Sequence, residues 1–436
     1  MASSDDGDIF EEEGVEVPKA PIKSVNKENK DDKQMLSQLK ITVSDPEKKT
    51  KQSGLKMQET FVVYLIESSP KTEDSTMIEE VSSLWRRYSE FELLRNYLVV
   101  TYPTVIVPPL PEKRANFIWT KITATDTFDT DFLERRRGGL ESFLHRIAGH
   151  SKLGCDKLVS DFITKEEGFR EKVTATGFQA KSDSWLKKVN ASLRVKQPDI
   201  RFEQLKYYAN QLHEGASALL KVRAKLAERV YGIYKIHGNY ARVFKEWALT
   251  ENSDLKLALQ KASNEVEVWA NSIDTLIDEE DIIAEQLKEY LYFADSLKTV
   301  CKKHEAQQYD VEWYENQVML TMTEKKKVLT GNTKAFSLSG MKARLLGGDT
   351  AEQTEQKLEQ LDKNIRDLED KFESHRSQAS DFLEEALQEV EIFKKRKRMD
   401  LREIFISYTI LQIKLHREGC AKWGKFKSLF DNLLKS

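Results

Sequence analysis

Apolar residues in the C-terminal half of the chain recur at intervals of three and four over long stretches. Because an α-helix turns once about every 3.6 residues, this spacing gathers them along one helix face. The two clearest runs are Leu219, Val222, Leu226, Val230, Ile233, Ile236, Tyr240, Val243 and Trp247, and Leu358, Leu361, Ile365, Leu368 and Phe372. All nine prolines lie at or before Pro198, so no proline breaks a helix in residues 199–436. The pattern predicts very long helices.

Two polar segments interrupt this pattern, TENSD at 250–254 and a glycine-bearing stretch at 331–350. They divide the region into three predicted helices, near 199–250, 254–330 and 351–434. At about 1.5 Å per residue the second would be on the order of 110 Å long, which is several times the diameter of a globular domain. We therefore expect an elongated antiparallel three-helix bundle whose exposed apolar stripes invite a second copy of a similar chain.

The N-terminal half shows strand signals instead. Runs rich in β-branched and aromatic residues occur in LKITVSD (39–45), ETFVVYLIE (59–67) and EEVSSLWRRY (79–88). Turn-rich PEKKTKQSG separates the first two runs. The sequence predicts three antiparallel strands in a meander.

Helical spacing follows these strands at Phe91, Leu94 and Leu98, and two more helices are predicted near 131–149 and 155–164. The intervening YPTVIVPPLPEKR (102–114) contains four prolines, which exclude a helix and favour polyproline II over Pro108–Pro111. Residues 36–165 thus read as a small α+β domain.

The remaining segments are a tail and a linker. Residues 1–35 carry ten Asp and Glu and five Lys, a composition typical of disorder. In SWLKKVNASLRVK (184–196), Trp185 shares a face with Val189 and Leu193, as in an interfacial amphipathic helix or a helix docked between two domains. The expected division is a disordered acidic tail at 1–35, an α+β domain at 36–165, a linker at 166–198 and a helical domain at 199–436.

Composition narrows the function. The net charge of −3 gives no global cationic field, so nucleic acid is not an expected partner. Cys155, Cys301 and Cys420 have neither metal-ligand nor disulfide spacing. No secretory signal and no apolar run of about 18 residues is present, which predicts a cytoplasmic protein with at most peripheral membrane contact. Phosphate-binding loops, nucleophile elbows and dinucleotide fingerprints are missing too, so neither enzymatic activity nor a cofactor is expected.

Candidate chemistry lies in SLWRRYSEFELL (83–94), where Arg86 and Arg87 precede Tyr88. An arginine holds a phosphate through two parallel hydrogen bonds, and a tyrosine ring can stack on the face of a sugar or inositol. The pair suits a phosphorylated ring. Alternatively, the arginines are solvated and Tyr88 belongs to the core.

In order, RRYSEF, PPLPEKR and ERRRGGLESFL resemble the PX (phox-homology) domain over residues 36–165. The resemblance implies that Arg87 holds the 3-phosphate of phosphatidylinositol 3-phosphate and that Tyr88 stacks on its inositol. It also implies that Lys113 meets the 1-phosphate and Arg136 the ring hydroxyls at positions 4 and 5. The neighbours Arg135 and Arg137 compete with Arg136 for that register.

The three predicted helices resemble a BAR domain, a crescent-shaped dimer. The fold class is therefore an α+β PX domain, with a three-stranded antiparallel sheet plus helices, followed by an all-α elongated three-helix BAR-type antiparallel coiled coil. This order resembles sorting nexins of the SNX-BAR class. It implies a protein on the cytosolic face of early or recycling endosomes, with a role in recycling and autophagy. The implied partners are anionic membrane and, as homodimer or heterodimer, another SNX-BAR chain.

Membrane contact would involve cationic and aromatic side chains, since each Lys or Arg near an anionic surface contributes ~1 kcal/mol. The candidates are Trp119, Trp185, Lys342 and Arg344, the run KKRKR (394–398) with Lys395, Arg396 and Lys397, and the patches Lys302/Lys303 and Lys325–Lys327. Trp119 could equally pack in the core, and KKRKR could be a nuclear-import signal. The alternative for the whole protein is a PX-targeted coiled-coil tether that does not curve membranes.

Overall fold

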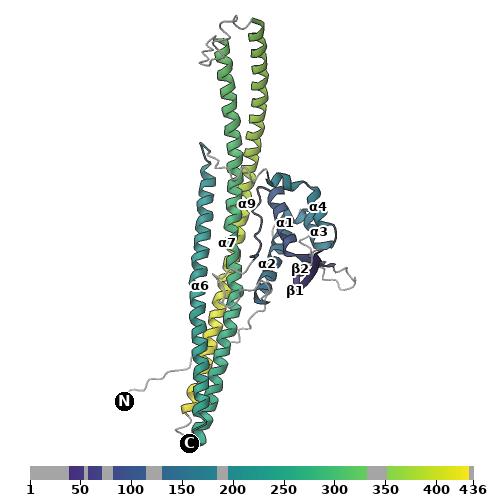
Figure 1. The fold of residues 1–436 in the computed structure, drawn as a ribbon. Helices are drawn as coiled ribbons and strands as arrows, with labels where there is room; N and C mark the ends of the chain where they lie inside the picture. The colour runs from purple at the N-terminus through teal and green to yellow at the C-terminus, as the bar shows by residue number, and fades with distance from the viewer. Residues whose placement is uncertain are drawn as a thin grey trace, which may run out of the picture.

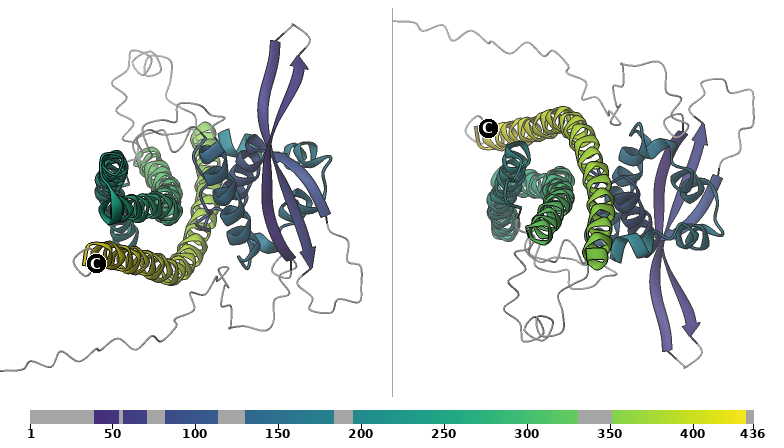
Figure 2. Two further views of the ribbon diagram at one scale, coloured as in Figure 1. Left: turned by 90° about the horizontal axis from the view of Figure 1, so that it is seen from below. Right: turned by 90° about the horizontal axis from the view of Figure 1, so that it is seen from above.

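The fold is that of a computed structural model that describes residues 39–53, 57–70, 82–113, 130–183, 195–330 and 351–431. A small α+β domain packs against the side of a long helical bundle (Figure 1). Viewed along the bundle, helices of the small domain lie between its sheet and the bundle (Figure 2). The predicted fold class is confirmed.

The sheet has the predicted antiparallel meander, in the order β1 (Leu39–Ser53), β2 (Met57–Pro70) and β3 (Ser82–Arg87). Strand β1 was wrongly expected to end near residue 45. It continues to Ser53 because a bulge between Ser44 and Glu47 carries it past Asp45, whose φ is 42°. Beyond the bulge the ladder resumes opposite β2.

Helices α1 (Tyr88–Thr101), α2 (Thr130–Ala148), α3 (Lys157–Thr164) and α4 (Phe169–Ala175) complete the small domain, with a short 3-10 turn at Leu153–Cys155. Its core extends beyond residue 165, where we expected the domain to end. Phe169, Val173 and Phe178 are buried in that core, and the Phe162 and Phe169 rings meet edge-on at 4.9 Å. Burial of these apolar side chains keeps the chain folded past α3.

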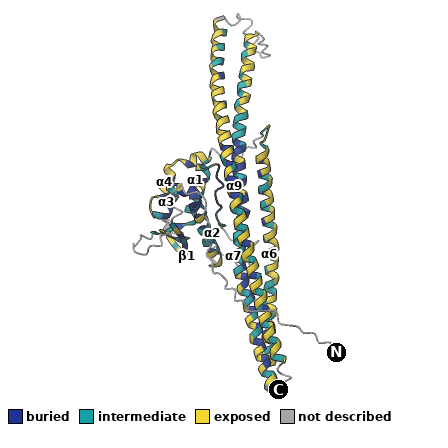
Figure 3. Cartoon of the chain, turned by 180° about the vertical axis from the view of Figure 1, so that it is seen from behind, coloured by how far each residue is buried: buried dark blue, intermediate teal, exposed yellow. Residues whose placement is uncertain are grey.

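The bundle consists of α6 (Ile200–Trp247), α7 (Ser253–Leu329) and α9 (Ala351–Asp431), as the proline-free pattern predicts. Helices α7 and α9 continue beyond α6 as a two-helix arm (Figure 1). Buried residues of the bundle are concentrated on α7, whereas much of α6 and of α9 is exposed (Figure 3). No helix among the described segments has the length and apolarity to cross a bilayer.

Charged pairs join the small domain to the bundle. Arg146 of α2 donates twice to Glu289 of α7, at 2.6 and 2.7 Å, and pairs with Asp400 of α9 at 2.8 Å. These carboxylates raise the pKa of Arg146 although burial opposes it. His150 contacts Glu389 at 3.0 Å, and so does Lys152. The charge pairs fix one arrangement of the two domains.

A loop between α1 and α2 lies in the seam between the domains. We call residues 102–113 the proline loop. Val105 and Val107 belong to the core of the small domain, whereas Ile106 packs into the bundle core with Tyr290 and Phe293. The segment Ile106–Glu112 has neither helix nor strand, consistent with its prolines. Alternate side chains of one loop therefore contribute to two cores.

Candidate functional site

Arg86 and Arg87 have opposite environments. Arg86 is 2% exposed, and its guanidinium donates to the carbonyls of Phe162 (3.1 Å), Glu166 (2.7 Å) and Lys165. Burial lowers its pKa. Because all three acceptors follow or end α3, Arg86 ties the sheet to that segment and is not available to a ligand.

Arg87 ends β3 and caps α1. Its backbone N–H donates to Glu90 at 2.8 Å, and its guanidinium carbon lies 3.7 Å from the centre of the Phe61 ring. Strand pairing explains this contact: Val63 is opposite Arg87, and Phe61 is the next residue on that face of β2. The stack holds the Arg87 fork beside the start of α1, a role for Phe61 that the residue pattern alone did not predict.

Tyr88 begins α1 and reaches the proline loop. Its hydroxyl donates to the Pro111 carbonyl at 2.6 Å, and the Arg136 guanidinium carbon lies 5.0 Å from its ring centre. Burial raises the pKa of Tyr88 to about 12. The tyrosine is therefore neutral and fixes where the proline loop lies over α1.

Arg136 is the member of ERRR that lies beside Tyr88 and the proline loop. It is 6% exposed and donates to the carbonyls of Glu112 (3.3 Å) and Lys113 (2.5 Å). Arg135 instead faces Glu285 of α7 at 3.8 Å, and Arg137 donates to Glu134 and Glu141. The rotation of about 100° per helical residue separates the three.

Lys113 is the most exposed member of the group. Its ammonium pairs with Glu92 of α1 at 2.8 Å. A surface pair of this kind contributes about 0–1 kcal/mol, so a stronger anion can displace Glu92 at little cost. The structure thus gathers Tyr88, Lys113 and Arg136 around the end of the proline loop, with Arg87 next to Tyr88 along the chain.

The candidates for membrane contact that lie within the described residues have different environments. Trp119, Trp185, Lys342 and Arg344 lie outside the described residues. Arg396 donates to the Gly149 carbonyl at 2.9 Å, so its side chain joins the two domains. Lys397 lies over the Tyr208 ring of α6 at 5.0 Å, while Lys395 is exposed.

The expected patch at Lys302/Lys303 is wrong for Lys303. This residue is buried and its ammonium donates to the carbonyls of Val99 and Pro103 at the end of α1. Burial lowers its pKa to about 7. Helix periodicity could not show this, because the docked small domain is what covers Lys303.

Comparisons with known proteins agree with this architecture. Residues 74–166 match the PX domain family. Sorting nexin-4 of Homo sapiens is 44% identical over 398 residues, which cover 91% of this chain and 88% of that protein. Sorting nexin-4 of Saccharomyces cerevisiae is 24% identical over 399 residues, covering 88% of this chain and 92% of that protein. The solved structure titled "The cryo-EM structure of the SNX-BAR Mvp1 tetramer" has a TM-score of 0.56 at 18% identity, covering 88% of this chain and 99% of that chain.

A PX domain followed by a long three-helix bundle has the fold of the SNX-BAR class, and together with the sequence relatives it defines a peripheral membrane-associated protein. The chain belongs to the sorting nexin family and resembles sorting nexin-4 over most of its length. Members of this class are lipid-binding adaptors, so the expectation of a non-enzymatic protein is confirmed by the family. The family also assigns the chain a membrane-associated role in sorting.

Proposed function

We propose that the chain binds phosphatidylinositol 3-phosphate through Arg87, Tyr88, Lys113 and Arg136. The observation that supports this is that Tyr88 of α1, Arg136 of α2 and Lys113 meet at the end of the proline loop, with Arg87 adjacent to Tyr88 at the end of β3. Arg87 offers a bidentate fork to the 3-phosphate and Lys113 a point charge to the 1-phosphate. Tyr88 provides the ring face. The Arg136 guanidinium donates to the carbonyls of Glu112 and Lys113, and its remaining N–H groups would donate to the ring hydroxyls.

Vesicle binding tests this proposal on the full chain. Vesicles of equal charge carry phosphatidylinositol 3-phosphate, phosphatidylinositol 4-phosphate or phosphatidylserine alone. We expect clear preference for the first. Equal binding to all three would reduce the site to a non-specific cationic surface and overturn the proposal.

We also propose a dimer, either of two such chains or with another SNX-BAR chain. Apolar side chains of α6 are exposed along its length: Leu219, Val222, Leu226, Ile233, Ile236, Tyr240, Val243 and Trp247. On α9, Phe405, Ile406, Ile410 and Ile413 are exposed as well. An apolar face of this length is typical of an interface. Light scattering after size exclusion measures the mass directly, and a monomer at micromolar concentration would contradict a homodimer.

The proposed dimer bends anionic membrane through cationic side chains on its bundle. Within 394–398, Lys395 and Arg398 are exposed and three residues apart on α9. Lys395→Glu with Arg398→Glu should impair tubulation of anionic liposomes while binding of soluble headgroup persists. Arg396 stays unchanged because it joins the domains. Unchanged tubulation would favour the alternative, a tether that does not curve membranes.

The remaining expectations belong to the same proposal: endosomal recycling with a role in autophagy, on the cytosolic face of early or recycling endosomes. Family membership supports a sorting role, and binding of phosphatidylinositol 3-phosphate would direct the chain to endosomal membranes. Localisation of a tagged chain before and after depletion of phosphatidylinositol 3-phosphate tests this step. Retention on endosomes after depletion would contradict it.

A further inference from the structure

Helix α7 of the bundle contacts the part of the proline loop that carries Lys113. The Glu112 side chain, 10% exposed, accepts a hydrogen bond from the Tyr292 hydroxyl and pairs with the Lys288 ammonium at 3.2 Å. Both partners lie one helical turn apart on α7. We call Glu112, Lys288 and Tyr292 the α7 contact.

The same residue is held from the opposite side by the candidate site. Arg136 donates to the backbone carbonyls of Glu112 and Lys113, and Tyr88 donates to that of Pro111. Side-chain donors of the site hold the backbone carbonyls of residues 111–113, and side-chain donors of α7 hold the Glu112 carboxylate, so both sets converge on three consecutive residues. A displacement of Glu112 toward or away from α7 must move the carbonyls that orient Arg136 and Tyr88.

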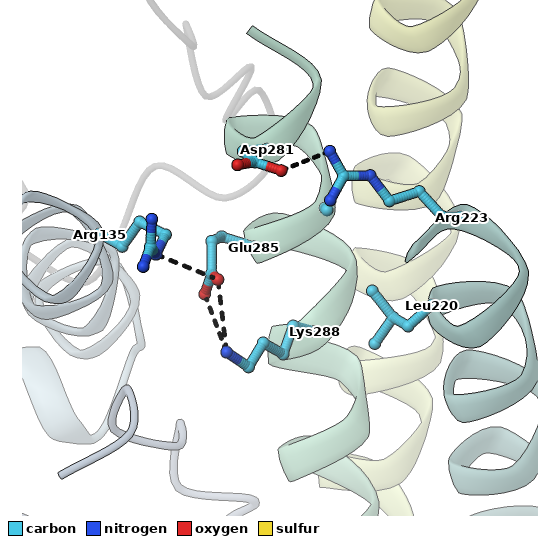
Figure 4. A pocket seen from close by; sticks show the side chains of 7 residues that line it. Arg135, Leu220, Arg223, Asp281, Glu285 and Lys288 are labelled. Carbon is cyan, nitrogen blue, oxygen red and sulfur yellow. Dashed lines mark hydrogen bonds and ion pairs between the residues drawn. The ribbon is translucent and has the colours of Figure 1, made fainter. Parts of the chain in front are cut away.

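Lys288 links this contact to a wider charged network. It lies 3.3 Å from Glu285, whose carboxylate also faces Arg135, the neighbour of Arg136 in α2 (Figure 4). These residues line a small cleft where α2, α6 and α7 meet. Lys288 is 6% exposed, and a buried ammonium is stable only while its carboxylates stay in place.

Two further contacts attach the proline loop to α7. Ser296 donates to the Val107 carbonyl at 2.9 Å, and Arg95 joins Ser296 to the Pro108 carbonyl. The upstream part of the loop is therefore fixed by packing and several hydrogen bonds. The downstream end of the loop, which bears Lys113, is attached to the bundle through the α7 contact.

We propose that Glu112 is a positioning residue of the phosphoinositide site, through which α7 sets the end of the proline loop for the headgroup. The inference rests on the proposed function, because it assigns the ligand to that same site. Its consequence is reciprocal: if α7 orders the site, a bound headgroup stabilises the α7 contact by the same factor.

Tyr292→Phe on the full chain is the direct test, because it removes one hydroxyl without changing charge and touches no residue of the site. Affinity for soluble inositol 1,3-bisphosphate, measured by calorimetry, should fall about fivefold. Tyr290→Phe is the matched control: it lies on the same helix, and its hydroxyl donates to Asp400 of α9 and not to the loop. We expect its affinity to stay within about twofold of the wild type.

Hydrogen exchange supplies a readout that needs no ligand. Without ligand, amides of the non-proline residues in 105–113 should exchange faster in Tyr292→Phe than in Tyr290→Phe. In a second measurement, added headgroup should protect α7 near residue 290 in the wild type. In the Glu112→Gln background, Tyr292→Phe should add little further loss of affinity, because both changes break one contact.

Three results would overturn the inference. Wild-type affinity in Tyr292→Phe would show that the contact is structural only, even where loop exchange rises. An equal loss in Tyr290→Phe would assign the effect to general loosening between the domains. Absence of headgroup binding by the folded wild type would remove the proposed function itself, a result distinct from the other two.

Discussion

Substituting each of the two adjacent arginines of β3 tests the proposal that Arg87 binds the ligand while Arg86 is structural. Arg86→Ala removes a buried charged donor from three carbonyls. Losing one partner of a buried charged contact typically costs about 3–5 kcal/mol. Arg87→Ala removes the stacking of the guanidinium on the Phe61 ring, a contact that contributes about 1 kcal/mol or less at an exposed site. For binding of phosphatidylinositol 3-phosphate we expect the opposite order, with the larger direct loss of affinity in Arg87→Ala.

For Arg87→Ala, loss of a hydrogen-bonded charge on a phosphate should cost about 2–5 kcal/mol, which is thirtyfold or more in vesicle affinity. Stability is best followed by hydrogen exchange of the β2 and β3 amides, since the bundle dominates the circular dichroism signal. The expected loss in Arg86→Ala corresponds to exchange that is roughly two to four orders of magnitude faster. Arg86→Lys is the control, because one ammonium cannot serve three divergent carbonyls and should recover only part of the loss.

The assignment fails if Arg87→Ala retains wild-type affinity for phosphatidylinositol 3-phosphate. It also fails if Arg86→Ala keeps normal exchange in β2 and β3 while losing affinity, because Arg86 would then be the phosphate ligand. Both variants losing stability alike would mean that Arg87 also has a structural role.

Three other substitutions each test one further feature of the structure. In Gly139→Ala the new Cβ would lie 2.7 Å from Pro111, so headgroup affinity should drop severalfold, whereas Gly138→Ala, with no atom within 4 Å, should leave affinity unchanged; equal affinities would show that the loop can yield. Burial lowers the pKa of His304 from 6.5 to about 4, so the unfolded chain binds this proton first and the free energy of unfolding should fall by about 3 kcal/mol between pH 6.5 and 4. His304→Phe should lose that part of the slope in denaturant titrations, and an unchanged slope would contradict the assignment. Ile236→Glu with Val243→Glu places charge in the exposed stripe of α6 and should convert the proposed dimer to a monomer in light scattering; a retained dimer mass would put the interface elsewhere.

Long-range regularity made most of the fold predictable. A proline-free region with sustained three-four spacing can bury its apolar face only as long helices, and α6, α7 and α9 end within a few residues of the predicted breaks. The meander was equally clear from its β-branched runs. What sequence spacing could not show was the bulge at Asp45, because local turn residues outweighed the strand signal that resumes after it.

The alternation of buried and exposed positions along β3 could have predicted that Arg86 is buried and that Arg87 is on the other face. Leu84 and Arg86 face the core while Trp85 and Arg87 face the other side, as two-residue alternation requires. The same geometric oversight affected KKRKR, since five successive helical residues span more than one full turn. Its members consequently contact Gly149, Tyr208 and solvent. The burial of Lys303 could not be predicted from the sequence, because a contact between the two domains causes it.

The charge pairs between the two domains bear on how a membrane would be recognised. Buried and half-buried ion pairs such as Arg146 with Glu289 contribute less to stability than to a unique arrangement, because desolvation offsets much of their attraction. With a fixed arrangement, one headgroup in the proposed PX site would bring the bundle to the same surface, so that the second contact would become intramolecular. The gain depends on orientation: a domain that turned freely on its linker would keep its headgroup affinity and lose most of this effective concentration. The charged seam, with the proline loop inside it, is therefore the part of the molecule that would convert two weak surface contacts into one strong one.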